Sequence, residues 1–200
     1  MLQKQKSEFT KQLILNESFK LFYKDGFKTT SVDKIMIKTK LTKGAFYYHY
    51  KNKKELGLDV IKLKIQKRVC DGMISPLYTS GNAIDILKAT FLNRIKAFPL
   101  EEKQQGCPMN NFINEIGDSE KVYQTALKSI IEEWKTALIN LIDKGKKQKT
   151  IKNAISSEAT AVYLISAFEG MRGIRKLYDT DEIIDEYVLG LSMYINQIKV

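Results

Sequence analysis

The sequence predicts an all-α protein in which an N-terminal three-helix head, a helix-turn-helix, precedes a helical bundle. Apolar residues recur at three- and four-residue spacing along most of the chain, and no convincing run alternates apolar and polar residues. Only 3 prolines and 11 glycines interrupt the 200 residues, so most of the chain is free to be helical. Two short helices joined by a tight turn, then much longer ones, place the head first and the bundle after it.

The helix boundaries follow from residues that cap or break helices. Gly26 ends the first helix, Thr30 or Ser31 can cap the second, and Thr42 can cap the third. Pro76 stops the fourth helix. With the apolar spacing, these signals predict about nine helices, at roughly 7–24, 32–39, 43–50, 53–75, 84–98, from 108 onward, from 119 to 141 and beyond, 156–178 and 181–197.

The composition excludes several classes of protein. Hydrophobic residues make up 44% of the chain and charged residues 28%, which argues against overall disorder. No stretch near 18 uncharged apolar residues is present, so we expect no membrane span and no membrane partner. The N-terminus lacks the apolar segment of a secretory signal, and 2 cysteines cannot form a disulfide scaffold. The cytoplasm is therefore the expected location.

Positive charge is concentrated at the N-terminal end. The formal net charge is +10 in total, of which residues 1–55 carry +8 and residues 56–70 carry +3, while the remainder is close to neutral. A basic first third on a neutral body suggests a module that binds a polyanion. The alternative is that the lysines form solvated faces that serve only solubility.

Residues 27–56, FKTTSVDKIMIKTKLTKGAFYYHYKNKKEL, closely resemble the DNA-binding signature of the TetR family of bacterial transcriptional regulators. The matching positions are Gly26, Thr29, Thr30, Ile35, Leu41, Thr42, Lys43, Gly44, Phe46, Tyr47, His49, Tyr50 and 53–56, with Ile14, Phe19 and Phe22 in the first helix. The segment GCPMNNFINEIGD and the helices after it look like one group of C-terminal domains in such regulators. The resemblance implies a DNA-binding domain at 1–55, and a domain at 56–200 that dimerises and binds a small molecule.

The third predicted helix has the residues that entry into a major groove requires. Short residues at its N-terminal end let the backbone approach the bases, and a lysine between them can reach a phosphate or a guanine edge. A lysine at the start of the fourth helix suits a phosphate. The candidate DNA contacts are Thr29, Thr30, Lys40, Thr42, Lys43, Gly44, Ala45, Tyr47, Tyr48, His49 and Lys53.

Some of these residues have a second interpretation. Phe46 and Tyr50 lie four apart and favour core positions, and Tyr47 either packs or offers its hydroxyl to a phosphate. His49 is the only histidine, so it cannot build a metal site or a catalytic triad by itself. Lys40 stands where the family usually has Gly; if the turn needs a positive φ, Lys costs about 1 kcal/mol there.

The body offers candidates for a dimer interface and for a ligand pocket. Small residues recur on one face of the eighth helix at Ser166, Gly170 and Gly173, which favours a dimer interface made with the ninth helix; packing within one chain is the alternative. The pocket candidates are Phe91, Ile95, Met109, Phe112, Trp134, Phe168, Met171 and Arg172, most of which would serve equally as core.

Cys107 precedes a proline at a predicted helix start, where free N–H groups stabilise a thiolate. This position suggests a thiol sensor of electrophiles or oxidants, whereas a small buried cysteine is the plainer interpretation. Cys70 lies 37 residues away on the predicted fourth helix, and the sequence alone does not decide whether the two cysteines pair.

The leading hypothesis is a ligand-responsive transcriptional regulator. It would repress by binding a palindromic double-stranded DNA operator as a homodimer, and an unknown small-molecule effector would release it. The alternative is a DNA-binding protein of the same fold that acts structurally or through a protein partner. An enzyme is not expected, because the sequence has no glycine-rich phosphate loop, HExxH, CxxC or GxSxG motif; neither a cofactor nor a metal is implied.

Overall fold

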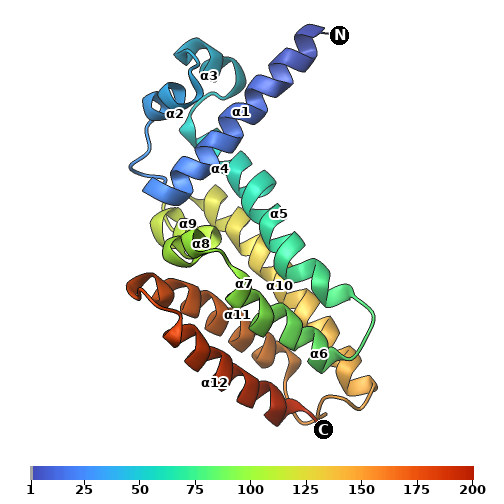
Figure 1. Cartoon of the computed structure of the whole chain (residues 1–200). Coiled ribbons are helices and arrows are strands. Elements are labelled where there is room, and N and C mark those ends of the chain that lie inside the picture. Colours follow the sequence, from blue (N-terminus) through green and yellow to red (C-terminus); the bar gives the residue numbers. More distant parts are fainter. Residues whose placement is uncertain (1) are drawn as a thin grey trace. The chain divides into compact units, whose positions relative to one another are not determined.

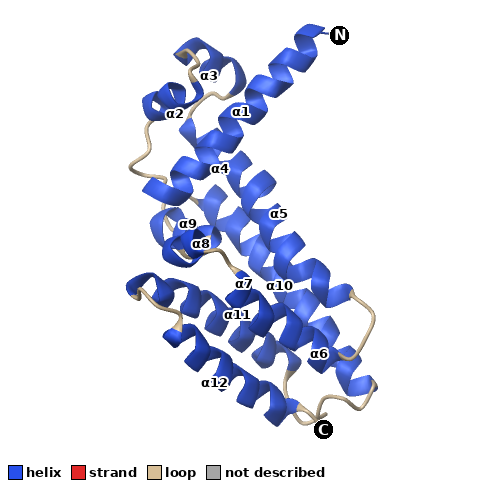
Figure 2. Ribbon diagram, viewed as in Figure 1, coloured by secondary structure: helices blue, strands red, loops and turns tan. Residues whose placement is uncertain are grey.

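The computed structural model describes residues 2–200, and these residues fold almost entirely into helices (Figure 1, Figure 2). The helices are α1 (Leu2–Asp25), α2 (Val32–Thr39), α3 (Lys43–His49), α4 (Lys53–Val60), α5 (Gln66–Val69), α6 (Ala83–Lys88), α7 (Arg94–Ala97), α8 (Leu100–Gln105), α9 (Pro108–Ile116), α10 (Lys121–Lys147), α11 (Ser157–Ile174) and α12 (Glu182–Ile198). The described part contains no strand beyond one isolated bridge, between Ile151 and Lys199. The predicted all-α class is confirmed.

The predicted long fourth helix is present, but it is not uniform. Helical structure continues from α4 to Tyr78 through π-helical segments at Ile61–Ile65 and Cys70–Ile74, and it ends in a 3₁₀ turn, Ser75–Tyr78. A third π-helical segment, Ala89–Asn93, joins α6 to α7. Such segments are rare and are frequently found at functional sites.

The short helix α8 was not predicted from the sequence. None of its six residues is buried. It therefore lacks the apolar stripe from which a helix is recognised.

The chain divides into two compact units. The first contains the residues up to Lys67 together with Asn111–Lys128, and the second contains Arg68–Asn110 and Ser129–Val200. The helices α9 and α10 therefore each contribute residues to both units. The predicted boundary between residues 55 and 56 stays a prediction.

The first unit has a core of apolar side chains from the head helices. Ile14 of α1, Ile35 of α2 and Phe46 of α3 are all completely buried. An aromatic cluster extends this core, with the Phe22 ring 4.9 Å from that of Phe27 and 6.1 Å from that of Phe112, centroid to centroid. Because Phe112 belongs to α9, burial of apolar surface fixes part of α9 in the same unit as the head.

The second unit has its own aromatic centre. The rings of Phe91, Trp134 and Phe168 lie 5.6–6.2 Å apart and come from the π-helical segment before α7, from α10 and from α11. All three side chains are at most 1% exposed. This centre holds α6–α7, α10 and α11 together.

Candidate nucleic-acid interface

The turn between α2 and α3 has a defined backbone geometry. The Ser31 hydroxyl caps α2 by accepting a backbone N–H from its first turn at 3.1 Å. At the other end, the Lys40 N–H donates to the Ile37 carbonyl, and the Leu41 N–H donates to the Met36 carbonyl. Lys40 has φ 57° and ψ 31°, so the helix ends in a Schellman motif. The turn does need a positive φ, and a lysine occupies the position that glycine favours.

The N-terminal end of α3 is capped and open to its surroundings. The Thr42 hydroxyl accepts the Ala45 backbone N–H at 3.3 Å, as predicted for a cap. Thr42, Lys43 and Gly44 are exposed, and a Cβ on Gly44 would meet nothing nearer than the Thr42 hydroxyl at 3.7 Å. A DNA backbone or base edge could therefore approach this end of the helix closely.

Some side chains of the next turn of α3 lie in the core and others lie on the surface. Phe46 and Tyr50 are buried, so the interpretation of both as core residues is confirmed. Tyr47 is 57% exposed and Tyr48 is 76% exposed, which leaves both hydroxyls available to a partner. His49 is half-buried; burial, aided by the nearby Lys11 ammonium, lowers its pKa and favours the neutral imidazole.

Lys43 is not a free cation in this structure. Its ammonium lies 2.7 Å from the Asp33 carboxylate of α2, and that hydrogen bond raises the lysine pKa. Both side chains are more than half exposed, so the pair is weak and water competes with it. DNA binding would require Lys43 to exchange this carboxylate for a phosphate or a base.

The predicted phosphate contact of Lys53 is not the contact that its side chain makes here. The ammonium donates to the carbonyls of Phe27 at 2.8 Å and Thr30 at 3.0 Å, and it lies 4.5 Å from the centre of the Phe27 ring. Burial lowers its pKa. Lys53 therefore ties the loop after α1 to the start of α4.

The structure also differs from the prediction that Thr30 contacts DNA. It is completely buried, and its hydroxyl donates to the Gly26 carbonyl at 2.8 Å. Its hydroxyl is therefore directed to the backbone rather than to a ligand. Thr29 remains exposed and bonds to the Asp25 carbonyl.

Sequence reasoning missed Glu115, which holds the same loop. Its carboxylate in α9 accepts the backbone N–H of Phe27 at 2.7 Å and that of Lys28. Gly26, with φ 91°, lets the chain turn there, and a Cβ at that position would lie 3.2 Å from the Glu115 carboxylate. A residue 88 positions along the chain thus fixes the path between α1 and α2.

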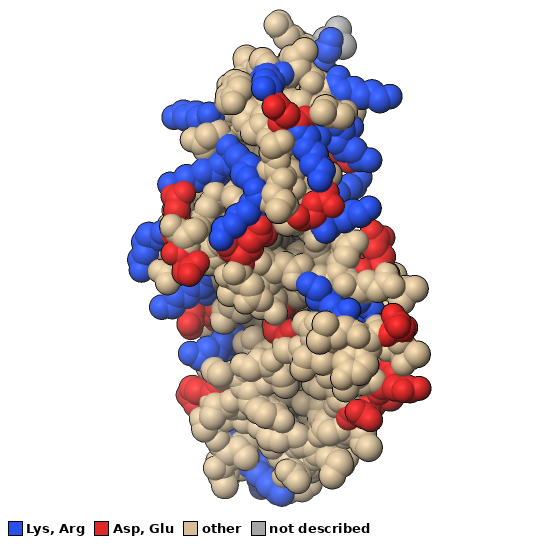
Figure 3. All heavy atoms as spheres, turned by 90° about the vertical axis from the view of Figure 1, so that its left-hand side faces the viewer, with Lys and Arg blue, Asp and Glu red and all other residues tan. Residues whose placement is uncertain are grey.

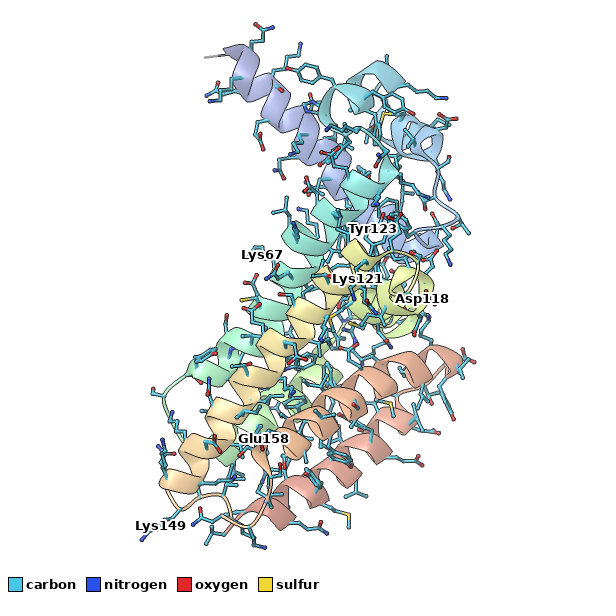
Figure 4. All side chains as sticks on the ribbon, turned by 180° about the vertical axis from the view of Figure 1, so that it is seen from behind. Lys67, Asp118, Lys121, Tyr123, Lys149 and Glu158 are labelled. Carbon is cyan, nitrogen blue, oxygen red and sulfur yellow. The ribbon has the colours of Figure 1, made fainter. Side chains whose placement is uncertain are left out.

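The first turn of α10, in which Figure 4 labels Lys121 and Tyr123, also contacts the start of α4. The Tyr123 hydroxyl lies 3.4 Å from the Lys54 carbonyl, and the Lys54 ammonium pairs with Glu120. A Cβ on Gly57 would clash with the Phe27 ring at 2.7 Å, so α4 and Phe27 are in close contact. Together with Glu115, these contacts join the part of the first unit after residue 110 to the head.

Most of the predicted pocket residues are core. Phe91, Met109, Trp134 and Phe168 are at most 1% exposed and fill the interior of the second unit, because large apolar side chains pack closely against one another. Phe112 is a clear correction, since it packs in the aromatic cluster of the first unit. Ile95, Met171 and Arg172 do line a cavity with Phe98, but its volume is only about 10 Å³, enough for one water molecule at most.

A much larger hollow lies elsewhere in the second unit. Its volume is about 440 Å³, and it is bordered by Gly72, Pro76, Thr79, Ser80, Gly81, Asn82, Asp85, Ile86, Ala89, Thr90 and Arg94. No residue of this lining was among the pocket candidates. The one feature of the sequence that could have indicated this hollow is Arg94, a charged residue among the apolar residues of the predicted fifth helix.

The environment of Cys107 disfavours the thiolate that a reactive cysteine needs. It is 4% exposed, and burial raises its pKa to about 12, with a further contribution from the buried Glu169 carboxyl group. At neutral pH the group is therefore a thiol rather than a nucleophilic thiolate. The structure supports the plainer interpretation of a small buried cysteine.

The helices α11 and α12 leave an apolar face uncovered. Ser166 and Gly170 are exposed, Gly173 is half-exposed, and a Cβ on Gly170 would have no neighbour within 4 Å. The large apolar side chains exposed on these two helices are Val162, Tyr163, Ile174, Leu189 and Met193. A surface of this kind is typical of a protein–protein interface.

Lysines and arginines are dense over the N-terminal unit in the face drawn in Figure 3. No helix of the described residues is long and apolar enough to cross a membrane. No cluster of His, Cys, Asp and Glu among those residues could hold a metal ion.

Two family models match the chain. Residues 14–60 match the model of bacterial regulatory proteins of the tetR family, and residues 83–190 match the tetracyclin repressor-like C-terminal domain. The HTH-type transcriptional repressor DhaR of a Mycobacterium species is 22% identical over 89% of this chain and 88% of its own length. An uncharacterised HTH-type regulator of Lactococcus lactis is 29% identical over 62% of this chain and 63% of its own length.

Solved structures agree with this fold. A TetR transcriptional regulator from Chloroflexus aurantiacus superposes with a TM-score of 0.85 at 23% identity, covering 98% of both chains. A TetR-family regulator from Cytophaga hutchinsonii gives 0.84 at 22% identity, over 98% of this chain and 97% of that one. The chain belongs to the TetR family of bacterial regulatory proteins. It is accordingly a DNA-binding transcriptional regulator, with its helix-turn-helix in α2 and α3.

Proposed function

We propose that this regulator is a repressor that binds a palindromic operator as a homodimer and leaves it when a small molecule binds its body. The observation that carries the proposal is the open N-terminal end of α3, where Thr42, Lys43 and Gly44 are exposed beyond a capped turn. A recognition helix contacts base edges with its N-terminal residues. Exposed Tyr47 and Tyr48 would add hydroxyls on the next turn.

The dimer is supported by the apolar face of α11 and α12. A stable interface buries more than about 1,000 Å² in total. Two copies of this chain joined through α11 and α12 would bury side chains such as Leu189 and Met193, which are more than half exposed in one copy. The two α3 helices of such a dimer would read half-sites about 34–36 Å apart.

Control by a ligand would pass through helices that have residues in both units. The helix α9 starts in the second unit, and its Glu115 holds the loop after α1 in the first. A ligand in the second unit that moves α9 would therefore change how the head is held. It acts only through its different affinities for the two arrangements, and such couplings are typically ~1–3 kcal/mol.

The direct test is selection of bound duplexes from a random DNA pool by the purified protein, followed by footprinting. We expect a two-fold symmetric sequence, protection of two half-sites, and an affinity that falls steeply with salt because several phosphates are neutralised. Placing the selected site upstream of a reporter should lower its expression when the regulator is present.

Other outcomes would overturn parts of the proposal. Equal binding to all sequences would favour the structural or partner-dependent role instead. A symmetric site whose reporter rises with the protein would replace repression with activation. Tight binding of a full operator by a monomer would contradict the dimer.

A further inference from the structure

The side chain of Arg94 occupies an unusual position in the second unit. Arg94 begins α7, directly after the π-helical segment Ala89–Asn93. Its guanidinium lies against Gly72, in the π-helical segment Cys70–Ile74. A Cβ at Gly72 would lie 2.6 Å from the Arg94 Cζ, so the absence of a side chain there makes room for the guanidinium.

The charge of Arg94 is poorly compensated. Burial lowers its pKa, and the neighbouring guanidinium groups of Arg68 and Arg172 lower it further. The acid that opposes this effect is Glu102, whose carboxylate is already paired with Arg68. The cluster therefore holds more positive than negative charge, which favours an added anion.

Two buried hydrogen-bond donors at this place lack partners. The Arg94 Nε has none within the described residues, and neither has the hydroxyl of Thr90, which is 3% exposed. A buried polar group that lacks a hydrogen bond costs free energy, so an acceptor at this place would stabilise the folded protein. Thr90 and Arg94 are four residues apart, so they lie on one side of the helix, and both border the same hollow.

The hollow has space for a small organic molecule. Its volume is about 440 Å³, within the range of ligand sites. Pro76, Ile86 and Ala89 make part of the lining apolar. A second hollow of about 230 Å³ reaches Arg94 from the side of Phe98 and Pro99.

We propose that this hollow binds a small organic carboxylate, with the carboxylate on Arg94 and Thr90 and the apolar part against Pro76 and Ile86. A carboxylate accepts the guanidinium fork and the hydroxyl together. One negative charge matches the one arginine of the lining, whereas the second charge of a phosphate dianion would find no further cation there and would add to the repulsion by Asp85. The role of this carboxylate as the effector of the repressor rests on the proposed function. Its binding to the hollow is independent of that function.

The test uses the purified full chain, with sodium benzoate and sodium hexanoate as probes. Benzamide and hexanamide are their neutral counterparts, and inorganic phosphate is the competing anion, all at equal ionic strength. We expect at least one carboxylate to raise the melting temperature and to give a calorimetric Kd, because a ligand that binds the folded state stabilises it. The amides and phosphate should do neither.

Arg94→Gln should weaken the binding of that carboxylate roughly ten- to hundredfold, as expected for the loss of a charged hydrogen-bond partner. The matched control is Lys96→Gln, which removes one exposed positive charge from the same helix and should leave the Kd within about twofold, since surface charges contribute little. If Arg94→Gln does not fold, Thr90→Val is the second variant, and it should also weaken binding.

Three results would overturn the assignment. These are no binding of either carboxylate by the wild type, equal binding by Arg94→Gln, and binding of the amides or of phosphate as tight as that of the acids. The outcome is separate from that of the proposed function, because operator binding by the ligand-free protein is measured without any carboxylate. A carboxylate that binds the hollow but does not release DNA would support the site and contradict its role as the effector.

Discussion

Lys40 holds a backbone conformation that costs free energy. A left-handed conformation costs roughly 1–2 kcal/mol for a residue with a Cβ, and glycine avoids most of this. We expect Lys40→Gly to raise the free energy of unfolding by about 0.5–1 kcal/mol, since part of the gain is offset by the greater freedom of glycine in the unfolded chain. The urea midpoint of the full chain measures this.

The control for that substitution is Lys38→Gly, two residues earlier and in regular helix. Lys38 is exposed and lies in the last turn of α2. Glycine inside a helix costs about 1 kcal/mol relative to alanine, so this change should lower stability. A loss of stability in both variants would show that strain at residue 40 is not the cause.

Lys53 illustrates how a cation that suits DNA can serve the fold instead. Its ammonium bonds to the Phe27 and Thr30 carbonyls, so Lys53→Met should lower the free energy of unfolding by about 1 kcal/mol after allowance for solvent. The slope of log affinity for DNA against log salt should stay unchanged, because no phosphate contact is removed.

Lys51→Met is the matched control, because Lys51 is exposed and two residues away. Its effect on stability should stay within about 0.5 kcal/mol. If Lys53→Met instead leaves stability unchanged and reduces the salt slope by about 1, then Lys53 neutralises a phosphate after all.

Cys107 gives a prediction about pH. Burial raises its pKa from 9.0 to about 12, so the folded state favours the neutral thiol. This contribution to stability is complete below pH 9 and is lost as the pH rises toward 12. At pH 8, iodoacetamide should modify Cys107 roughly a thousandfold more slowly than an ordinary thiol.

Cys70 is the internal reference, because it is partly exposed. Mass spectrometry of the digested protein separates the two sites. Equal labelling of Cys107 and Cys70 in the folded protein would contradict this prediction and support the interpretation of Cys107 as a thiol sensor.

At the scale of elements, α2 and α3 are joined by an ion pair across their exposed surface. Asp33 of α2 holds the Lys43 ammonium of α3 and places a negative charge beside the N-terminal end of α3, the end that we propose faces DNA. Asp33→Asn should therefore raise affinity for operator and non-operator DNA alike. The increase should be up to about fivefold, which corresponds to the free energy of an exposed ion pair.

Asp118→Asn removes an exposed negative charge from the loop before α10 and is the control. Fluorescence anisotropy at several salt concentrations compares the two variants. A fall in affinity with Asp33→Asn would mean that Asp33 positions Lys43 for DNA rather than competing with DNA for it.

Another element-scale feature is the loop after α1, which is held at both sides. Glu115 accepts the N–H groups of Phe27 and Lys28, and Lys53 donates to carbonyls of the same loop. The loop is therefore attached to α9 as well as to α4. This double attachment is the physical basis for expecting movement of α9 to reach the head.

For the molecule as a whole, the decisive prediction concerns dimerisation. Gly170 is exposed on α11 with open space beside it, so leucine fits the single chain and improves helix propensity. In a dimer closed through α11 and α12, the added side chain would separate the two copies. Gly170→Leu should therefore be monomeric by light scattering and should lose operator binding.

Ser129→Leu, an exposed position on α10, is the control and should remain dimeric. Circular dichroism should report full helicity for both variants. A Gly170→Leu protein that is still a dimer would remove this residue from the interface.

Local patterns in the sequence determined the all-α class, the helix-turn-helix and its caps. Helical spacing, the Ser31 and Thr42 hydroxyls and the helix end at Gly26 act over a few residues, so they can be read without knowing the packing. The left-handed conformation of Lys40 was suggested only by the resemblance to a family that usually has glycine there, because a lysine carries no local signal for a positive φ.

Only the tertiary structure decided where buried and charged side chains point. Phe112 packs in the first unit, Lys53 turns to the carbonyls after α1, and Glu115 reaches a loop 88 residues away. The spacing of apolar residues along a helix is the same whether their side chains pack in a core or line a pocket. The hollow at Arg94 depends on Gly72, from another helical stretch, and such pairs arise from packing between segments rather than from the periodicity of either one.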